Sequence, residues 1–193
     1  MTLAVSRRRF LVGAGAMVAG ACAGGGDNAE DSDLDFASDA AAIERLAVDH
    51  FTGTGRLMTD GKLGALVPQA LAALVAGAVG QHRQAQDAWN RILTDAGRAE
   101  VTAPPAKAQE ALNAAGLRVT DIPSAATLAL RLEDYVGQVY QRALPTLARP
   151  ETITLAGQVS VVAHQRQAVL RYLLGRDPVA PAGADPQLRL ISG

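Results

Sequence analysis

The sequence predicts an all-α fold built around four long helices, and three observations lead to this prediction. Hydrophobic residues make up 49% of the 193-residue chain, alanine is abundant among them, and aromatic residues make up only 4%. Alanine and leucine favour helices, whereas strands favour Val, Ile and aromatic residues. Apolar residues recur at helical spacing in four segments. Turn sequences or prolines separate these segments, so one helical domain with appendages is expected.

The first two helices are expected to form a hairpin. Ser38 or Asp39 can cap a helix that runs to Met58. The following sequence DGKLG, residues 60–64, is rich in turn-forming residues. A second helix is expected from about 67 to 95, with a proline in its first turn.

The last two helices are expected to form a second hairpin. Three prolines interrupt 96–124, so this segment is a long crossover that holds at most one short helix. The third helix is expected at about 124–147, and the turn 148–151 follows it. The fourth helix runs to Gly175, and the proline-containing residues 177–193 form an irregular tail.

The N-terminus has the features of an export signal. Three arginines at 7–9 precede a short apolar run, 10–21, which ends in small residues. Such a run is too short to span a bilayer comfortably and is typical of a cleaved signal peptide, here residues 1–21. The sequence SRRRFL at 6–11 resembles the twin-arginine consensus, which implies export of the already folded protein.

The residues around Cys22 resemble a lipobox, AGAC at 19–22. Acylation would make Cys22 the mature N-terminus and anchor the protein to the membrane, in the periplasm or on the outer face of a membrane. The alternative is ordinary cleavage beside Cys22, which gives a soluble exported protein. Residues 22–37 are glycine-rich and then acidic, so they are expected to form a flexible tether.

Charge and cysteine content exclude several classes of function. The formal net charge is −1, so the chain has no basic excess suited to nucleic acid, and nucleic-acid binding is set aside. A single cysteine excludes an internal disulfide or a cluster of thiolate metal ligands. The sequence contains no nucleophile elbow, phosphate loop or zinc-protease motif, so no catalytic residue is assigned.

An internal repeat relates the first and third helices. Glu44 lies seven residues before Phe51, and Glu133 lies seven residues before Tyr140, so each pair is two turns apart on one side of its helix. Together with the crossover, this repeat resembles the ferritin-like superfamily, especially exported ferritin-like proteins of bacteria, over a four-helix bundle at 38–176. The resemblance implies a di-metal centre with one glutamate from each of these helices and a Glu-x-x-His pair from each of the others.

The two Glu-x-x-His pairs are absent from this sequence. On the apolar face of the second helix, the corresponding positions hold His82 and Ala85. In the fourth helix, Ala163 and Arg166 lie on or beside the apolar face. The predicted metal site is therefore degenerate.

The candidate metal ligands that remain are Glu44, His82 and Glu133. Two carboxylates and a histidine could hold one zinc, iron or manganese ion, so the expected cofactor is either none or a single metal ion. Arg166 is a permanent cation where a ligand should stand. We expect Arg166 to replace the missing metal charge by pairing with Glu133 or Glu44.

For the other polar and aromatic residues, the sequence also allows an ordinary structural role in place of a role in the site. His50 and Tyr140 complete the expected interior polar set, but His50 and His82 can also be ordinary core histidines, and Tyr140 and Trp89 can be packing residues. The glutamates can equally lie at the boundary of the core and reach solvent. His164 faces away from the apolar stripe and is expected on the solvated surface.

These features predict an exported, lipid-anchored ferritin-like protein of the cell envelope with a degenerate metal site and a non-catalytic binding or structural role. The alternative is a metal-binding oxidase or iron-handling protein with a rearranged site. A third hypothesis is a bundle that binds an apolar ligand or a partner helix between its alanine-rich helices. The ligand stays unassigned, and a homo-oligomer is compatible with the sequence.

Overall fold

The structure, a computed structural model, describes residues 26–64 and 66–179, and every regular element in these ranges is helical. The predicted all-α class is confirmed. The elements are α1 (Gly26–Thr59), α2 (Gln69–Asp95), α3 (Ala106–Gly116), α4 (Ile122–Ala143), a short 3₁₀ helix η1 (Leu144–Thr146) and α5 (Pro150–Leu173). The signal peptide, Cys22 and the tail from residue 180 onward lie outside the described residues.

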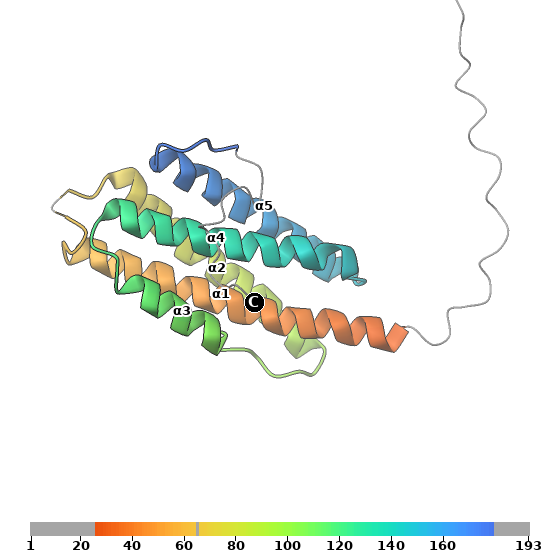
Figure 1. The fold of residues 1–193 in the computed structure, drawn as a ribbon. Helices are drawn as coiled ribbons and strands as arrows, with labels where there is room; N and C mark the ends of the chain where they lie inside the picture. The colour runs from red at the N-terminus through yellow and green to blue at the C-terminus, as the bar shows by residue number, and fades with distance from the viewer. Residues whose placement is uncertain (1–25, 65, 180–193) are drawn as a thin grey trace, which may run out of the picture.

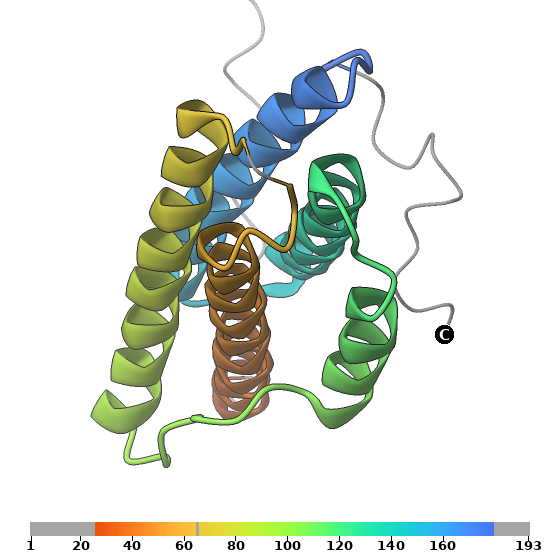
Figure 2. The same ribbon diagram turned by 90° about the vertical axis from the view of Figure 1, so that its left-hand side faces the viewer.

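The four long helices form two hairpins, one made by α1 with α2 and the other by α4 with α5 (Figure 1). Seen from one end, α2, α5, α4 and α1 surround a shared interior, and α3 lies outside them against α1 and α4 (Figure 2). The predicted crossover with one short helix is therefore confirmed, with α3 as that helix. Large side chains, including Trp89, Tyr140 and Phe51, fill the interior, while buried alanines of α1 allow close helix packing.

A capping box fixes the start of α4. The Asp121 carboxylate accepts a hydrogen bond from the Ser124 amide at 2.9 Å, and the Ser124 hydroxyl accepts one from the Asp121 amide at 3.2 Å. These reciprocal bonds satisfy donors that a helix N-terminus otherwise leaves unpaired. The helix consequently begins at Ile122, slightly before the predicted start at Ser124.

The start of α1 corrects the sequence-based expectation. The helix begins at Gly26 instead of Ser38, so the prediction of a flexible tether is wrong for residues 26–37. Side chains from this extension are buried, with Asp33 fully inaccessible to solvent and Leu34 only 8% exposed. On the outer side, Asp31 and Asp35 pair with Arg98 beyond the end of α2, at 3.1 and 2.6 Å. Asp31 and Asp35 thus have a tertiary partner, which a flexible tether would not provide.

Asp33 connects this extension to the start of α5. Its carboxylate accepts hydrogen bonds from the amides of Ala148 and Arg149 and, at 2.5 Å, from the hydroxyl of Thr152. These donors belong to the N-terminus of α5, where a negative charge is favourable. Burial opposes ionisation of Asp33, but the hydrogen bonds outweigh it and lower the pKa of the carboxyl below its ordinary value.

The described part of the predicted tail, residues 177–179, contains no helix. Within the described ranges, none of the helices is both long enough and apolar enough to cross a membrane.

Asp33→Ala is expected to lower the free energy of unfolding by about 3 kcal/mol, because the donors at the start of α5 lose a buried acceptor. Urea unfolding followed by circular dichroism measures the change. Since the folded-state pKa of Asp33 is lowered, its contribution should be present at neutral pH and disappear as pH falls below about 4. Asp35→Ala is the matched control and should cost less than about 1 kcal/mol, because Asp35 forms an exposed ion pair. Equal losses in the two variants would contradict the assigned role of Asp33.

Candidate functional site

Four buried charged or ionisable side chains meet in the interior, one from each long helix. Glu44 comes from α1, His82 from α2, Glu133 from α4 and Arg166 from α5. Their exposed fractions are 0%, 1%, 0% and 7%, so the alternative in which the glutamates reach solvent is wrong. The structure brings together all three predicted metal ligands and the predicted charge-replacing arginine. We call these four residues the central cluster.

His82 bridges the two carboxylates of the central cluster. Its Nδ1 lies 2.6 Å from Oε2 of Glu44, and its Nε2 lies 3.2 Å from Oε1 of Glu133. Burial opposes the charged imidazole, but Glu44 and Glu133 outweigh it and raise the pKa of His82 to about 9. At neutral pH His82 is therefore an imidazolium that joins the two hairpins.

Arg166 forms the ion pair that the sequence predicts. Its Nε donates to Oε1 of Glu133 at 2.5 Å, and its Nη2 lies 3.1 Å from Oε2 of the same carboxylate. This two-point geometry suits a planar guanidinium and is among the stronger charge-assisted interactions in proteins. Burial opposes ionisation of Glu133, but His82 and Arg166 outweigh it and lower the pKa of its carboxyl. Glu133 is consequently a carboxylate with two cationic partners.

Arg166 also approaches His82, with Nη2 lying 3.0 Å from Nε2 of the ring. This contact is a hydrogen bond only when Nε2 carries no proton, because both nitrogens are otherwise donors. Protonated, Nε2 donates to Glu133; deprotonated, it accepts from Arg166. Each protonation state of the imidazole thus has a partner for Nε2.

A hydrogen-bonded pair of aromatic residues supports Glu44. The Tyr140 hydroxyl donates to Oε1 of Glu44 at 2.8 Å and accepts from the Trp89 indole, also at 2.8 Å. Burial and the neighbouring Glu44 raise the pKa of Tyr140 well above its ordinary value, so the hydroxyl keeps its proton. Both oxygens of Glu44 are therefore occupied, one by Tyr140 and the other by His82.

The central cluster does not have the geometry of a coordination shell. A zinc, iron or manganese site requires several lone pairs that converge on one point about 2 Å away. Here the two ring nitrogens of His82 face different carboxylates, and the oxygens of Glu44 accept hydrogen bonds. Over residues 26–64 and 66–179, no group of three His, Cys, Asp or Glu side chains is arranged to hold a metal ion. The residues present do not fit a metal in this arrangement.

His50 lies beside the central cluster without bonding to it. Its Nε2 is buried and has no hydrogen-bond partner, and its ring packs edge-on against Phe51, which stacks on His82. Burial and the positive charge of His82 outweigh the opposing effect of Glu133 and lower the pKa of His50 to about 4. His50 is therefore a neutral core histidine at neutral pH.

The expectation for His164 is wrong. The residue is half-buried between α4 and α5, where its Nδ1 lies 2.6 Å from the Ser160 carbonyl oxygen and its Nε2 lies 2.9 Å from the Gln141 amide nitrogen. It packs against Gly137, where an added Cβ would lie 3.3 Å from the imidazole ring. His164 is thus an interhelical contact and does not reach the central cluster.

Two glutamines that contact the central cluster were not identified as site residues from the sequence. Gln81 lies on the exposed side of α2, yet its side-chain oxygen accepts a hydrogen bond from Nη1 of Arg166 at 2.6 Å. The Gln167 amide donates to the backbone oxygen of Glu133 at 2.8 Å. Each glutamine bonds to a residue on another helix, so the sequence of its own helix carries no signal that could have identified it.

One void in the interior is too small for a ligand. A void between α1, α2, α4 and α5, lined by residues that include Thr54, Leu71 and Leu170, has a volume of only about 10 Å³. A single water molecule needs a void of about this size. This void therefore gives no support to the hypothesis of an apolar ligand or a partner helix between the helices.

Comparisons with known proteins define similarity of fold alone. No protein-family model and no curated protein matches the sequence. Among solved structures, the chain is similar to the conserved hypothetical protein rv2844 from Mycobacterium tuberculosis, with a TM-score of 0.57 and 21% sequence identity. The match covers 76% of this chain and 98% of that protein. At this identity the similarity supports a shared helical arrangement.

His82 and His50 together should give the free energy of unfolding a maximum near pH 6.5. The raised pKa of His82 implies a contribution that is present below pH 6.5 and is lost as pH rises towards 9. The lowered pKa of His50 implies a contribution that is present above pH 6.5 and is lost as pH falls towards 4. Each effect is on the order of 3 kcal/mol at most. Urea-unfolding midpoints measured from pH 4 to pH 10 test this profile.

Histidine variants show which residue causes the loss of stability on each side of the pH maximum. His82→Gln should remove the alkaline decline, and His50→Gln should remove part of the acid decline. His164→Gln serves as the control and should retain both declines, because His164 lies away from the central cluster. An alkaline decline of unchanged size in His82→Gln would show that His82 is not the titrating group.

Proposed function

We propose that this chain is an exported ferritin-like bundle in which an internal ion-pair network stands in place of a metal centre. Its role in the cell envelope would be to bind or organise other molecules without catalysing a reaction. The observation that carries this proposal is the two-point pairing of Arg166 with Glu133 in the interior. A permanent cation occupies the position where the ferritin-like resemblance implies a metal ligand.

The charge balance of the central cluster supports the proposal. Glu44 and Glu133 contribute two negative charges, while Arg166 and protonated His82 contribute two positive charges. In a metal centre, divalent cations balance the carboxylates. Here Arg166 and protonated His82 balance the charge of the carboxylates, so the buried carboxylates have partners without a metal ion.

The accessibility of the cluster also supports a non-catalytic role. Three of its members are at most 1% exposed, and both oxygens of Glu44 are occupied by hydrogen bonds. A metal-dependent oxidase needs an open coordination position for oxygen or substrate. The cluster offers no such position in this arrangement, which favours the structural role over the oxidase or iron-handling alternative.

The N-terminal sequence supports an envelope location. The twin-arginine and lipobox resemblances imply export followed by acylation of Cys22. Because α1 begins at Gly26, only residues 23–25 would separate the anchor from the bundle. A segment of this length spans at most about 14 Å, so the start of α1 would lie close to the membrane surface.

Metal analysis of the purified domain, combined with Arg166 variants, tests the central part of this proposal. The domain should contain no stoichiometric iron, manganese or zinc, and a chelator should leave its melting temperature unchanged. Arg166→Ala should lower the free energy of unfolding by about 3 to 5 kcal/mol, because it leaves a buried carboxylate short of a partner. Arg83→Ala, at an exposed position on α2, is the control for loss of an arginine. Near-stoichiometric metal that disappears in Glu44→Ala or Glu133→Ala would instead support the metal-handling alternative.

The proposed anchor has a separate test. Mass spectrometry of the mature protein from membranes should find an acylated Cys22 as the first residue, and Cys22→Ala should release the protein into the soluble fraction. A mature protein with an unacylated first residue would contradict the lipoprotein assignment and leave the ion-pair network unaffected.

A further inference from the structure

A groove between α3 and α4 has the chemistry of an anion site. Its volume is about 340 Å³, close to the lower limit for small-molecule pockets. The helix α3 lies outside the four long helices, against α1 and α4 (Figure 2). The residues that line the groove are Ala115, Arg118, Val119, Ser124, Thr127, Leu128 and Arg131.

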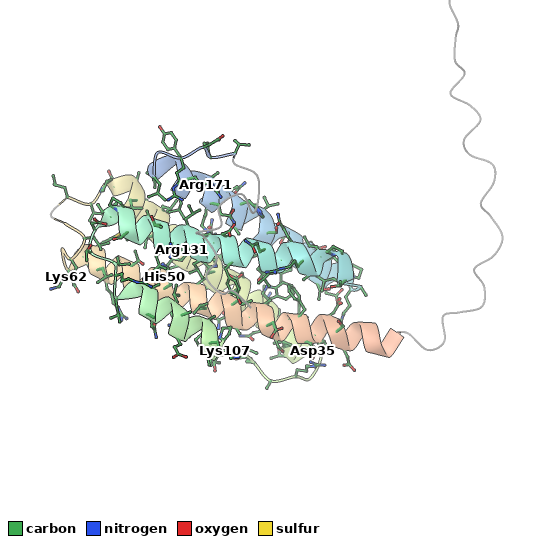
Figure 3. The ribbon with its side chains drawn as sticks, viewed as in Figure 1. Asp35, His50, Lys62, Lys107, Arg131 and Arg171 are labelled. Carbon is green, nitrogen blue, oxygen red and sulfur yellow. The ribbon has the colours of Figure 1, made fainter. Side chains whose placement is uncertain are left out.

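Two arginines in this groove have no anionic partner. Arg118 is exposed just after the end of α3, and Arg131 is half-buried. Figure 3 shows Arg131 on α4. Across residues 26–64 and 66–179, neither guanidinium forms a hydrogen bond or an ion pair, and Nε of Arg131 is buried without any acceptor. A buried donor without an acceptor is costly, and buried polar groups in folded proteins almost always have a partner. The groove therefore contains positive charge and an unpaired N–H donor, and an anionic hydrogen-bond acceptor would satisfy both.

The other residues of the groove restrict what that acceptor can be. The Ser124 hydroxyl donates to Asp121, and the Thr127 hydroxyl donates to the Pro123 carbonyl oxygen at 2.8 Å, so neither has a proton to offer a ligand. The arginines are thus the side-chain donors of the groove. The remaining wall is apolar, formed by Ala115, Val119 and Leu128, which pack on or within the hydrophobic core. A ligand that matches both parts carries an anionic oxygen group on a short apolar body.

We propose that the groove between α3 and α4 binds a small amphiphilic anion, with its carboxylate or phosphate held by Arg118 and Arg131 and its apolar part on Ala115, Val119 and Leu128. A planar guanidinium recognises either anionic group through paired hydrogen bonds. This site is separate from the central cluster, and its occupation does not depend on whether the cluster binds metal.

Isothermal titration of the full mature chain with sodium octanoate and with octyl phosphate tests the proposal and distinguishes the two headgroups. Saturable one-to-one binding of either probe below about 1 mM is expected, with octanol at least tenfold weaker because it lacks the charge. Arg131→Gln should weaken binding at least tenfold. Arg83→Gln, an exposed arginine on α2, is the control and should bind as the unaltered chain does.

A second variant separates loss of binding from loss of folding. Arg131→Met keeps a long apolar side chain but removes the unpaired donor, so it should raise the melting temperature in the absence of ligand while abolishing octanoate and octyl phosphate binding. Absence of saturable binding up to 10 mM of both probes, roughly tenfold above the expected range, would overturn the proposal. Equal binding by the unaltered chain and Arg131→Gln, or equal weakening in Arg83→Gln, would also overturn it.

Discussion

Two carboxylates lie buried at the centre of this bundle, and the arrangement of the long helices depends on how their charge is balanced. Removing a carboxylate from water is strongly unfavourable unless a cation and hydrogen bonds replace the solvent. Glu44 and Glu133 receive this compensation from His82 and Arg166, and each of the four residues belongs to a different helix. The contact between Glu44 and His82 connects α1 to α2, His82 connects the two hairpins through Glu133, and Arg166 connects α5 to α4. The same interactions that balance charge thus fix the helices relative to one another.

The four members of this cluster could be identified from the sequence by two different patterns. Helical periodicity placed His82 and Arg166 on or beside an apolar face, and the internal repeat singled out Glu44 and Glu133. Periodicity fails where polar residues are buried in the α4–α5 interface. On α5, Gln167 and Arg171 are buried while Val169 is exposed. Because burial on this helix does not follow the apolar stripe, periodicity wrongly assigned His164 to the solvated surface. Interhelical hydrogen bonds, which a single helical wheel does not contain, decide these positions.

Residues with distant partners could not be identified from local sequence. Asp33 lies in a segment whose composition indicates a solvated tether, yet it is buried through bonds to residues 115 to 119 positions later in the chain. The same limit applies to Gln81, whose role depends on the position of Arg166 on another helix.

The central cluster also explains why we place ligand binding on the outside of the bundle. The interior donors and acceptors of the cluster are mutually paired, whereas Arg131 beside α3 retains an unpaired donor.

The claim that side chains replace a metal charge depends most directly on the protonation state of His82. Nuclear magnetic resonance of the intact protein with isotope-labelled histidine can follow the ring nitrogens from pH 5 to pH 10. We expect an imidazolium at pH 7 whose deprotonation is centred near pH 9. A neutral His82 ring at pH 7 would leave the two carboxylates with a single cation and would rule out charge balance by side chains alone.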